Sequence, residues 1–202
     1  MRVKPFIYLA SQSPRRSQLL SQLGVEHRLL LPDASEDSEA LEVVLPGEAP
    51  LDYVQRVTGL KLQAALARLQ RLQWPLAPVL CADTTVALGR TILGKPQDAV
   101  HASQMLKQLA GRSHRVMTAI ALGDGTRIVR ECSVSRVRFA ALSDAQRAAY
   151  VASGEPMGKA GAYAVQGLAA AFIQRIEGSY SGIMGLPLFE TAQALRDMKV
   201  LE

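Results

Sequence analysis

Short apolar runs separated by turn signals recur along the chain and predict the strands of a sheet. The run Val79–Ala82 is wholly apolar and lies between Pro78 and Asp83, as expected of a strand buried at the centre of a sheet. Asp124-Gly125 predicts a tight turn between two long strands. The predicted strands are Phe6–Ala10, Val25–Leu31, Val79–Ala82, Thr84–Leu88, Thr91–Leu93, His114–Leu122, Arg127–Phe139, Tyr163–Val165 and Ala170–Ile176.

Other segments carry apolar residues at helical spacing. The longest runs from Leu51 to about Leu72, and Trp74-Pro75 then ends it. Ser143 and Gln146 have the spacing of a capping box at the start of another helix. The predicted helices are Arg15–Leu23, Leu51–Leu72, Asp98–Leu109, Ser143–Gly154 and Leu188–Met198.

The order of these elements predicts the fold class. Strands and helices are mixed, with antiparallel hairpins among them, which favours an α/β protein of the α+β style over a doubly wound sheet. No repeat, low-complexity tract or clean linker divides the chain, so we expect one domain over residues 1–202.

Composition excludes several classes of protein. The chain of 202 residues is 49% apolar and 20% charged, as in a globular protein with a substantial core. It contains no run of about 18 apolar residues that would cross a membrane, and Phe6–Ala10 is too short for a signal peptide. Cys81 and Cys132 lie in apolar runs and are expected to be reduced packing residues. A cytoplasmic location is the one expected.

The formal net charge of +5 raises the question of nucleic acid binding. The basic residues form no run and are not interleaved with aromatic residues, so nucleic acid is not the expected partner. A small anionic substrate accounts for the excess equally well. Lys and Arg are absent between Arg28 and Arg56, an interval that contains the acids Asp33, Glu36, Asp37, Glu39, Glu42, Glu48 and Asp52. Within it, the acidic stretch from Asp33 to Pro50 is expected to be a long loop.

The motif SQSPRR, residues 11–16, is a candidate anion site. Ser13 suits a helix N-cap and Pro14 the first helical position, which places Arg15 and Arg16 in the first turn. Cations there oppose the helix dipole by about 0.3–1 kcal/mol each, which favours an anion bound at the same helix start. The alternative is a plain strand–turn–helix with solvated arginines.

Asp83 follows the most apolar run of the chain, at the predicted rim of the sheet. A carboxylate there can act as a general base or hold a metal, although a simple turn aspartate is the alternative. The acidic loop offers a second carboxylate, for which Glu36 is the candidate. Phosphoryl chemistry uses Mg²⁺ or Mn²⁺, and Mg²⁺ takes one or two carboxylates plus water.

Three further polar residues stand in glycine-containing segments. Lys95 follows the predicted hairpin, and Lys159 lies in the segment GKAGAYAVQG; each is a candidate phosphate ligand or a solvated cation. Gln166 is a candidate for recognising uracil or thymine, because one amide both accepts from a ring N–H and donates to a ring carbonyl.

The motifs SQSPRR, ADTTVALGRTILGKP, QMLKQLAGRSHRVMTA, YVASGEP, KAGAYAVQG and GSYSGIMGLP, in this order and spacing, resemble the Maf family. The resemblance runs from about Leu9 to Leu195 and is closest to the dTTP/UTP pyrophosphatase branch. It implies a mixed α/β fold with two lobes around a cleft, as in inosine triphosphate pyrophosphatases. It also implies hydrolysis of dTTP or UTP to the monophosphate and pyrophosphate with a divalent metal. A homodimer is plausible by resemblance.

The resemblance also implies roles for single residues. Asp83 matches the proton acceptor of the family, and Glu36 matches its loop carboxylate. The residues that match the triphosphate cleft are Ser13, Arg15, Arg16, Lys61, Lys95 and Lys159. Arg15, Thr84 and Gln166 match the three positions that separate this branch from the 7-methyl-GTP branch.

Two departures from the family pattern stand beside these matches. The chain has Leu60-Lys61-Leu62 where the family has EKA, and Gly158 where it has an acid before Lys159. The alternatives to the pyrimidine enzyme are the 7-methyl-GTP branch, a nucleotide-binding regulator of septum formation, and a basic nucleic-acid binder.

Overall fold

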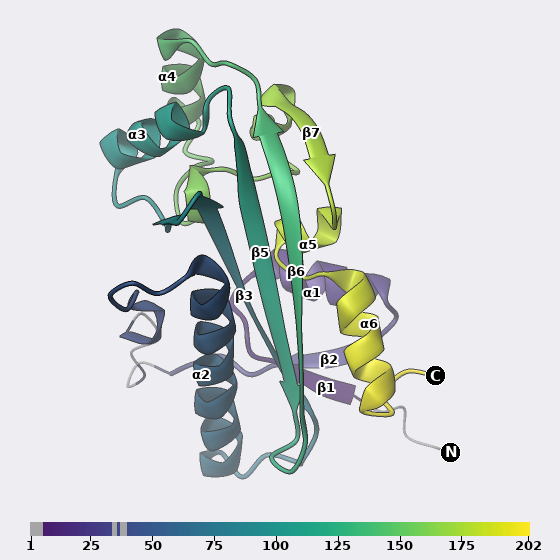
Figure 1. Ribbon diagram of the computed structural model, residues 1–202. Coiled ribbons are helices and arrows are strands. Elements are labelled where there is room, and N and C mark those ends of the chain that lie inside the picture. Colours follow the sequence, from purple (N-terminus) through teal and green to yellow (C-terminus); the bar gives the residue numbers. More distant parts are fainter. Residues whose placement is uncertain (1–5, 34–35, 37–39) are drawn as a thin grey trace.

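A computed structural model describes residues 6–33, 36 and 40–202, and its centre is one mixed sheet of seven strands (Figure 1). The strand order is β2-β1-β3-β5-β6-β7, with β4 beside β3. β1 pairs in parallel with β2 and β3, and the other pairs are antiparallel. The mixed α/β class predicted from the sequence is confirmed. The strands are β1 Phe6–Leu9, β2 Glu26–Leu29, β3 Val79–Leu88, β4 Thr91–Leu93, β5 Ser113–Gly123, β6 Ile128–Phe139 and β7 Ile173–Glu177.

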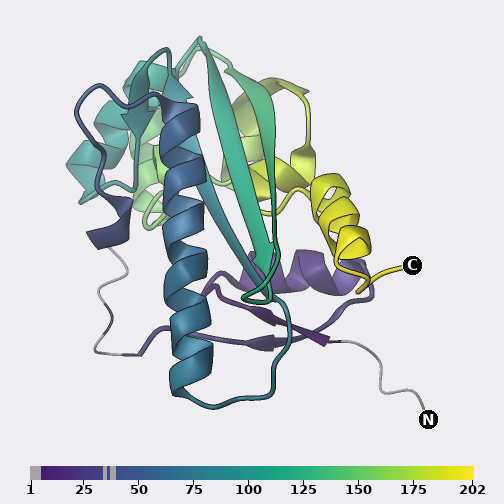
Figure 2. The ribbon, with the colours of Figure 1, turned by 60° about the horizontal axis from the view of Figure 1, so that its bottom comes forward.

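Helices cover both faces of this sheet. The α-helices are α1 Pro14–Gln22, α2 Pro50–Arg71, α3 Ala99–Leu109, α4 Asp144–Ala152, α5 Tyr180–Met184 and α6 Leu188–Asp197; short 3₁₀ helices are η1 Ala40–Glu42, η2 Ala160–Ala162 and η3 Leu168–Phe172. Leu62 of α2 packs with Cys81, whereas Leu20 of α1 and Leu195 of α6 pack with Leu80. Because successive residues of a strand point to opposite faces, α2 lies on one face and α1 and α6 on the other (Figure 2).

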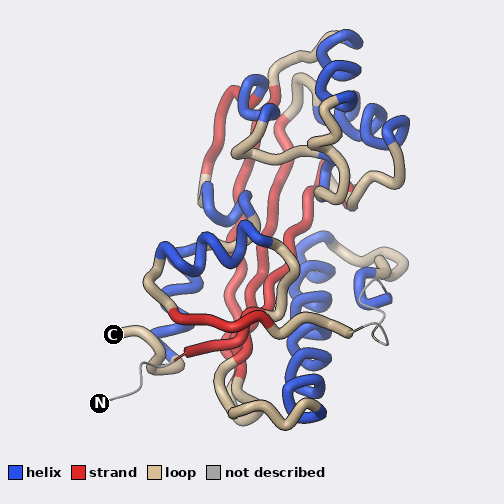
Figure 3. Tube along the Cα trace, turned by 180° about the vertical axis from the view of Figure 1, so that it is seen from behind, coloured by secondary structure: helices blue, strands red, loops and turns tan. Residues whose placement is uncertain are grey.

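The long strands β5 and β6 join two groups of elements (Figures 1 and 3). The group at one end contains β1, β2, α1, α2 and α6, and the group at the other end contains α3, α4 and β7. The second group has its own core, in which Phe139 packs against rings of Tyr163 and Phe172. The two predicted lobes are therefore the two ends of one continuous sheet.

One edge of β3 is left open between these ends. Its other edge pairs with β5 from Val79 to Ala87. On the open edge, β1 pairs only with Val79 and Leu80, and β4 only with Val86–Leu88. Within the described residues, no strand pairs with positions 81–85 on that edge, so the middle of the sheet is accessible from the side.

Three predictions about elements need correction. β3 runs through Asp83 without a break, so Asp83 lies inside a strand and not at its end. Tyr163–Val165 is not a strand, because the chain turns at Gly161 with φ +68° and approaches Val86 too closely for any side chain there. The predicted strand Ala170–Ile176 begins as η3 and becomes β7 only at Ile173.

Other predictions are confirmed. The capping box of Ser143 and Gln146 is formed, and Asp124 accepts the backbone N–H groups of the β5–β6 turn. Cys81 and Cys132 are free thiols that pack against the core. None of the helices in the described part of the chain is long and apolar enough to cross a membrane.

Candidate functional site

A cavity of about 720 Å³ opens at the unpaired segment of β3. It is lined by the start of α1, by η1, α2, β3 and β4, and by the segments around Lys159 and Met184. The structure brings nine of the ten predicted site residues to this cavity: Ser13, Arg15, Arg16, Glu36, Lys61, Asp83, Thr84, Lys95 and Lys159. Residues from six separate segments thus meet at one place.

Asp83 and Glu42 are joined by a single lysine. The ammonium nitrogen of Lys61 lies 2.5 Å from Oδ1 of Asp83 and 2.8 Å from Oε1 of Glu42. Lys95 Nζ donates to the other oxygen of Glu42 over 3.0 Å. Asp83 is 8% exposed, and its Oδ2 makes no hydrogen bond to a described residue. That oxygen is the unengaged acceptor of the group.

The charges in this group stabilise one another. Burial opposes the charge on Lys61, but Asp83 and Glu42 outweigh it and raise the pKa of Lys61 above its usual value. Burial also opposes ionisation of Glu42, and Lys61 and Lys95 nevertheless lower its pKa. Lys61 is therefore an ammonium and Glu42 a carboxylate at neutral pH, ready for electrostatic roles.

The start of α1 supplies the opposite charge. Arg16 Nε donates to the carbonyl of Gly185 over 2.7 Å, and its Nη1 donates to Ser11 Oγ over 3.1 Å. Gly185 has φ +117°, a left-handed conformation at the end of α5, and its carbonyl faces the guanidinium. Burial lowers the pKa of Arg16 and neighbouring Arg15 lowers it further, whereas Asp83 opposes the shift. Arg16 thus faces Asp83 across the cavity.

Arg15 and Lys159 form a second cationic group. Arg15 Nε donates to the carbonyl of Met184 over 3.4 Å, and Lys159 Nζ to that of Glu155 over 2.5 Å. Burial lowers the pKa of Lys159, and the charge of Arg15 lowers it further. Neither side chain forms an ion pair with a described residue. Two adjacent cations held by carbonyls are suited to an anionic ligand.

Ser13 and Thr84 supply hydroxyl groups to the same wall. Ser13 occupies the N-cap position as predicted, but its hydroxyl makes no capping hydrogen bond and stays available at the cavity. Thr84 Oγ1 lies 3.0 Å from Thr118 Oγ1, which donates to the carbonyl of Gly182. This chain of bonds fixes the Thr84 side chain.

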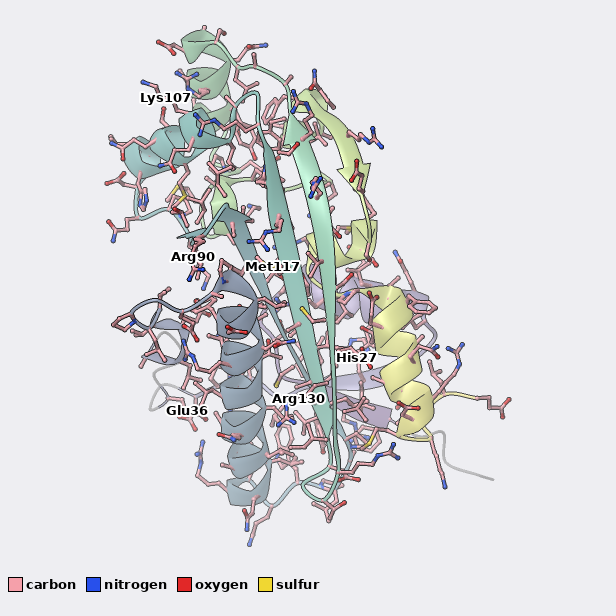
Figure 4. The ribbon with its side chains drawn as sticks, viewed as in Figure 1. His27, Glu36, Arg90, Lys107, Met117 and Arg130 are labelled. Carbon is pink, nitrogen blue, oxygen red and sulfur yellow. The ribbon has the colours of Figure 1, made fainter. Side chains whose placement is uncertain are left out.

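Glu36 and Asp83 have different partners. Its carboxylate pairs with Arg68 at 2.5 Å and with Arg71 at 2.9 Å, which lowers its pKa to about 2. Figure 4 shows Glu36 beside α2. The expected partnership of Glu36 with Asp83 is absent among the described contacts, because buried Arg68 already binds this carboxylate. Glu42 occupies the place next to Lys61.

Gln166 is the one predicted residue outside the cavity lining. It is exposed in the turn after Val165, which does line the cavity. The following residues are anchored by Glu155, whose carboxylate accepts the N–H groups of Leu168 and Ala169. Gln166 therefore follows the cavity lining directly along the chain, on a turn held by Glu155, and we call this position the rim.

Sequence reasoning missed Glu42 and Tyr53, which line the cavity, and Glu155, which holds the turn after Val165. Glu42 was one of six acids in the acidic loop, and no local pattern distinguished it. Tyr53 donates its hydroxyl to the Glu42 carbonyl over 2.9 Å, and burial together with Asp83 raises its pKa to about 12. Glu155 stands in the motif YVASGEP, which could have suggested it.

The described residues contain no group of three or more His, Cys, Asp and Glu side chains that could hold a metal. Asp83 and Glu42 nevertheless present two carboxylates to one point, now taken by the Lys61 ammonium. Because Mg²⁺ binds through one or two carboxylates, phosphate oxygens and water, this pair fits such an ion together with a phosphate ligand.

Comparison with known proteins points to one family. A protein of Albidiferax ferrireducens named dTTP/UTP pyrophosphatase is 67% identical over 191 residues, which cover 95% of this chain and 96% of that protein. A protein of the same name from a Polaromonas species is 62% identical, over 95% of this chain and 95% of that protein. Another, from Cupriavidus pinatubonensis, is 60% identical, over 96% of this chain and 98% of that protein.

A solved structure was also found. It is a protein of Mycobacterium abscessus named nucleoside-triphosphatase / dITP/XTP pyrophosphatase, with 19% identity and a TM-score of 0.42, covering 66% of this chain and 74% of that one. A sequence model of the family described as Maf-like protein matches residues 6–198. With that match and relatives of 60–67% identity along nearly its whole length, the chain belongs to the Maf family.

Proposed function

We propose that this protein hydrolyses dTTP and UTP to the nucleoside monophosphate and pyrophosphate. One observation carries the proposal: a carboxylate group of Asp83 and Glu42 faces the cations Arg15, Arg16 and Lys159 across one cavity. A triphosphate needs cations along its length and an oxygen base at the phosphorus under attack. The names of the close relatives support the same activity.

In the proposed mechanism, water attacks the α-phosphorus and pyrophosphate leaves. The free Oδ2 of Asp83 accepts the proton of the water, while Lys61 holds Oδ1 and fixes the orientation of the carboxylate. Arg15, Arg16 and Lys159 neutralise the charge that develops on the leaving pyrophosphate. Lys95, now paired with Glu42, moves to the phosphates when substrate enters.

A divalent ion, Mg²⁺ or Mn²⁺, completes the site. Asp83 and Glu42 would hold it at the point that the Lys61 ammonium now occupies, and Asp83 would then act through the ion instead of as the base. Glu36 stays with Arg68 and Arg71. When bound there, such an ion would supply Lewis-acid chemistry to the phosphate oxygens and to water. The two carboxylates would otherwise repel a polyanion, so their neutralisation by Lys61 or by the ion favours binding.

Selection of the base is assigned to Arg15, Thr84 and Gln166. Thr84 is fixed through Thr118, and Arg15 borders the cavity. Gln166 is exposed at the rim, where it would contact a base that projects out of the cavity. Its amide matches the N–H and carbonyl edge that uracil and thymine share.

A pyrophosphate-release assay over a panel of nucleoside triphosphates, with Mg²⁺ or Mn²⁺, tests this function. We expect release from dTTP and UTP and little from ATP or GTP. Equal use of dTTP and 7-methyl-GTP would contradict the pyrimidine assignment. Nucleotide binding without turnover would favour a regulatory protein, and binding to nucleic acid alone would remove the enzyme proposal.

Two further properties belong to the proposal. The unpaired thiols Cys81 and Cys132 suit a reducing cytoplasm. A homodimer is expected, and light scattering of the purified protein would measure it directly.

A further inference from the structure

The sheet face that α2 covers near the cavity is open in the other lobe, and arginines gather there. Met117 of β5 is fully buried under Val54 and Val57 of α2. Arg115 lies two residues before Met117 and therefore points to the same face. Figure 4 shows Met117 beside the upper part of α2, below the open stretch of β5 and β6.

The strand register places the arginines directly opposite one another. Arg115 of β5 is the partner of Arg136 of β6, and Arg138 of β6 is the partner of Arg175 of β7. Paired residues of neighbouring antiparallel strands project on the same face. These four residues, Arg115, Arg136, Arg138 and Arg175, form what we call the arginine face.

The arginine face has little internal compensation. Arg175 pairs with Glu177 at 3.0 Å, and Arg115 donates to the carbonyl of Gly89 at 2.8 Å. Arg136 also lies opposite Glu177 in the register, but that carboxylate is paired with Arg175. Arg136 and Arg138 are exposed, and their side chains make no hydrogen bond or ion pair with a described residue. The face therefore carries a net positive charge that the protein itself does not neutralise.

The opposed arginines lower the stability of the folded sheet. Like charges directly opposite each other on neighbouring strands are destabilising. An exposed strand face needs only polar side chains, and alternating signs or hydroxyl residues would meet that need. Two opposed pairs of arginines on three adjacent strands therefore favour an anionic partner that lies across them.

The surroundings indicate which anion. The other outward residues of these strand segments are Ser113, Val134 and Glu177, so the face has no aromatic ring on which a nucleic-acid base would stack. β7 is the last strand of the sheet, and Figures 1 and 3 show no element beyond it. An unpaired strand edge accepts an extended peptide as an additional strand.

We propose that the arginine face and the edge of β7 bind an extended acidic segment of a partner protein. Its backbone pairs with β7, and its acidic side chains on the arginine face lie beside Arg175 and extend toward Arg136 and Arg138, one strand further in. Arginine suits this role, because its planar fork binds a carboxylate through two hydrogen bonds. This surface is separate from the cavity, so the inference does not rest on the proposed function.

Binding of a labelled peptide tests the inference. The probe is a fluorescein-labelled peptide of alternating Glu and Thr, about ten residues long. The double variant Arg136→Gln/Arg138→Gln removes two positive charges from the arginine face. The control, Lys107→Gln/Arg196→Gln, removes two exposed charges elsewhere; Figure 4 shows Lys107 on α3. Fluorescence anisotropy measures the dissociation constant for each protein.

We expect the arginine variant to bind the peptide about tenfold more weakly and the control to bind like the parent. The arginine variant should also gain about 1–3 °C in Tm, because opposed charges are removed. Pyrophosphate release should be unchanged, which shows that the cavity is intact. Equal loss of binding in both variants would overturn the proposal, as would no binding by the parent. Tighter binding of single-stranded DNA or of anionic lipid vesicles than of the peptide would also overturn it.

Discussion

The ammonium nitrogen of Lys61 on α2 lies 2.5 Å from Oδ1 of Asp83, in the segment of β3 whose second edge pairs with no strand of the described residues. A carboxylate inside a strand has little freedom to rotate, and the lysine removes what remains. The open edge of the strand gives a ligand access to a side chain that is otherwise buried. Rigid placement and access are the two requirements of a catalytic base.

Asp83→Asn should therefore abolish turnover while the protein remains folded. Asparagine has nearly the same shape but accepts no proton from water, so we expect kcat to fall by about 100-fold or more. Pyrophosphate release from dTTP measures this. Asp98→Asn is the matched control, because Asp98 caps α3 away from the cavity and asparagine caps equally well. Normal turnover in Asp83→Asn would show that the base lies elsewhere.

Glu42→Gln and Glu36→Gln should separate the two candidate carboxylates. Glu42 faces Lys61 and Lys95, so its loss should lower activity by about 10–100-fold and raise the metal concentration required. Glu36 serves buried Arg68, so its loss should cost about 1–3 kcal/mol of stability in urea unfolding and leave activity largely intact. Loss of activity in Glu36→Gln with normal activity in Glu42→Gln would show that Glu36 is the catalytic carboxylate.

Gln166→Glu should change the use of substrate more than the stability. The residue is exposed, so Tm should stay within about 1 °C of the parent. A carboxylate cannot donate to a ring carbonyl and repels the triphosphate, so kcat/KM for dTTP should fall by about tenfold. Steady-state kinetics with dTTP and UTP measure the change. Unaltered kcat/KM for both nucleotides would mean that the base does not reach the rim.

The predicted elements agree with the structure where the signal is local. The periodic apolar residues of α2, the prolines before β3 and the Asp124-Gly125 turn each act within a few residues, and all three are found. The prediction of strands between Gly161 and Phe172 was wrong, because the apolar run in this segment resembles a strand. Close packing of Gly161 on Val86 and the anchoring by Glu155 decide its path, and both contacts are distant in sequence.

The residues of the candidate site also divide into those with a local sequence signal and those placed by contacts distant in sequence. The residues at the start of α1 were predicted from the unusual placement of two arginines in a first helical turn. Asp83 was expected at the end of a strand, but β3 continues beyond it, so its place in the cavity has another cause. Its access depends on where β1 and β4 stop pairing, which no local pattern encodes. The choice of Glu42 over Glu36 depends likewise on the partners that α2 brings to each acid.

His114 should make stability depend on pH. Its side chain is 2% exposed, with Nε2 2.8 Å from the hydroxyl of Tyr163, and burial lowers its pKa to about 4. An unfolded histidine titrates near pH 6.5, so between about pH 6.5 and 4 the unfolded chain binds more protons. This contribution to stability is therefore complete above about pH 6.5 and is lost as the pH falls toward 4, by about 2–3 kcal/mol.

His114→Gln removes the titrating ring and retains a group that can bond to Tyr163. The variant should be less stable at pH 7, because the aromatic contact of His114 with Phe139 is lost. Its free energy of unfolding should fall less than that of the parent between pH 7 and 4, as measured by urea unfolding. His101→Gln, which replaces a less buried histidine on α3, should keep the parental slope. Parallel pH profiles for the parent and His114→Gln would show that another group carries the acid sensitivity.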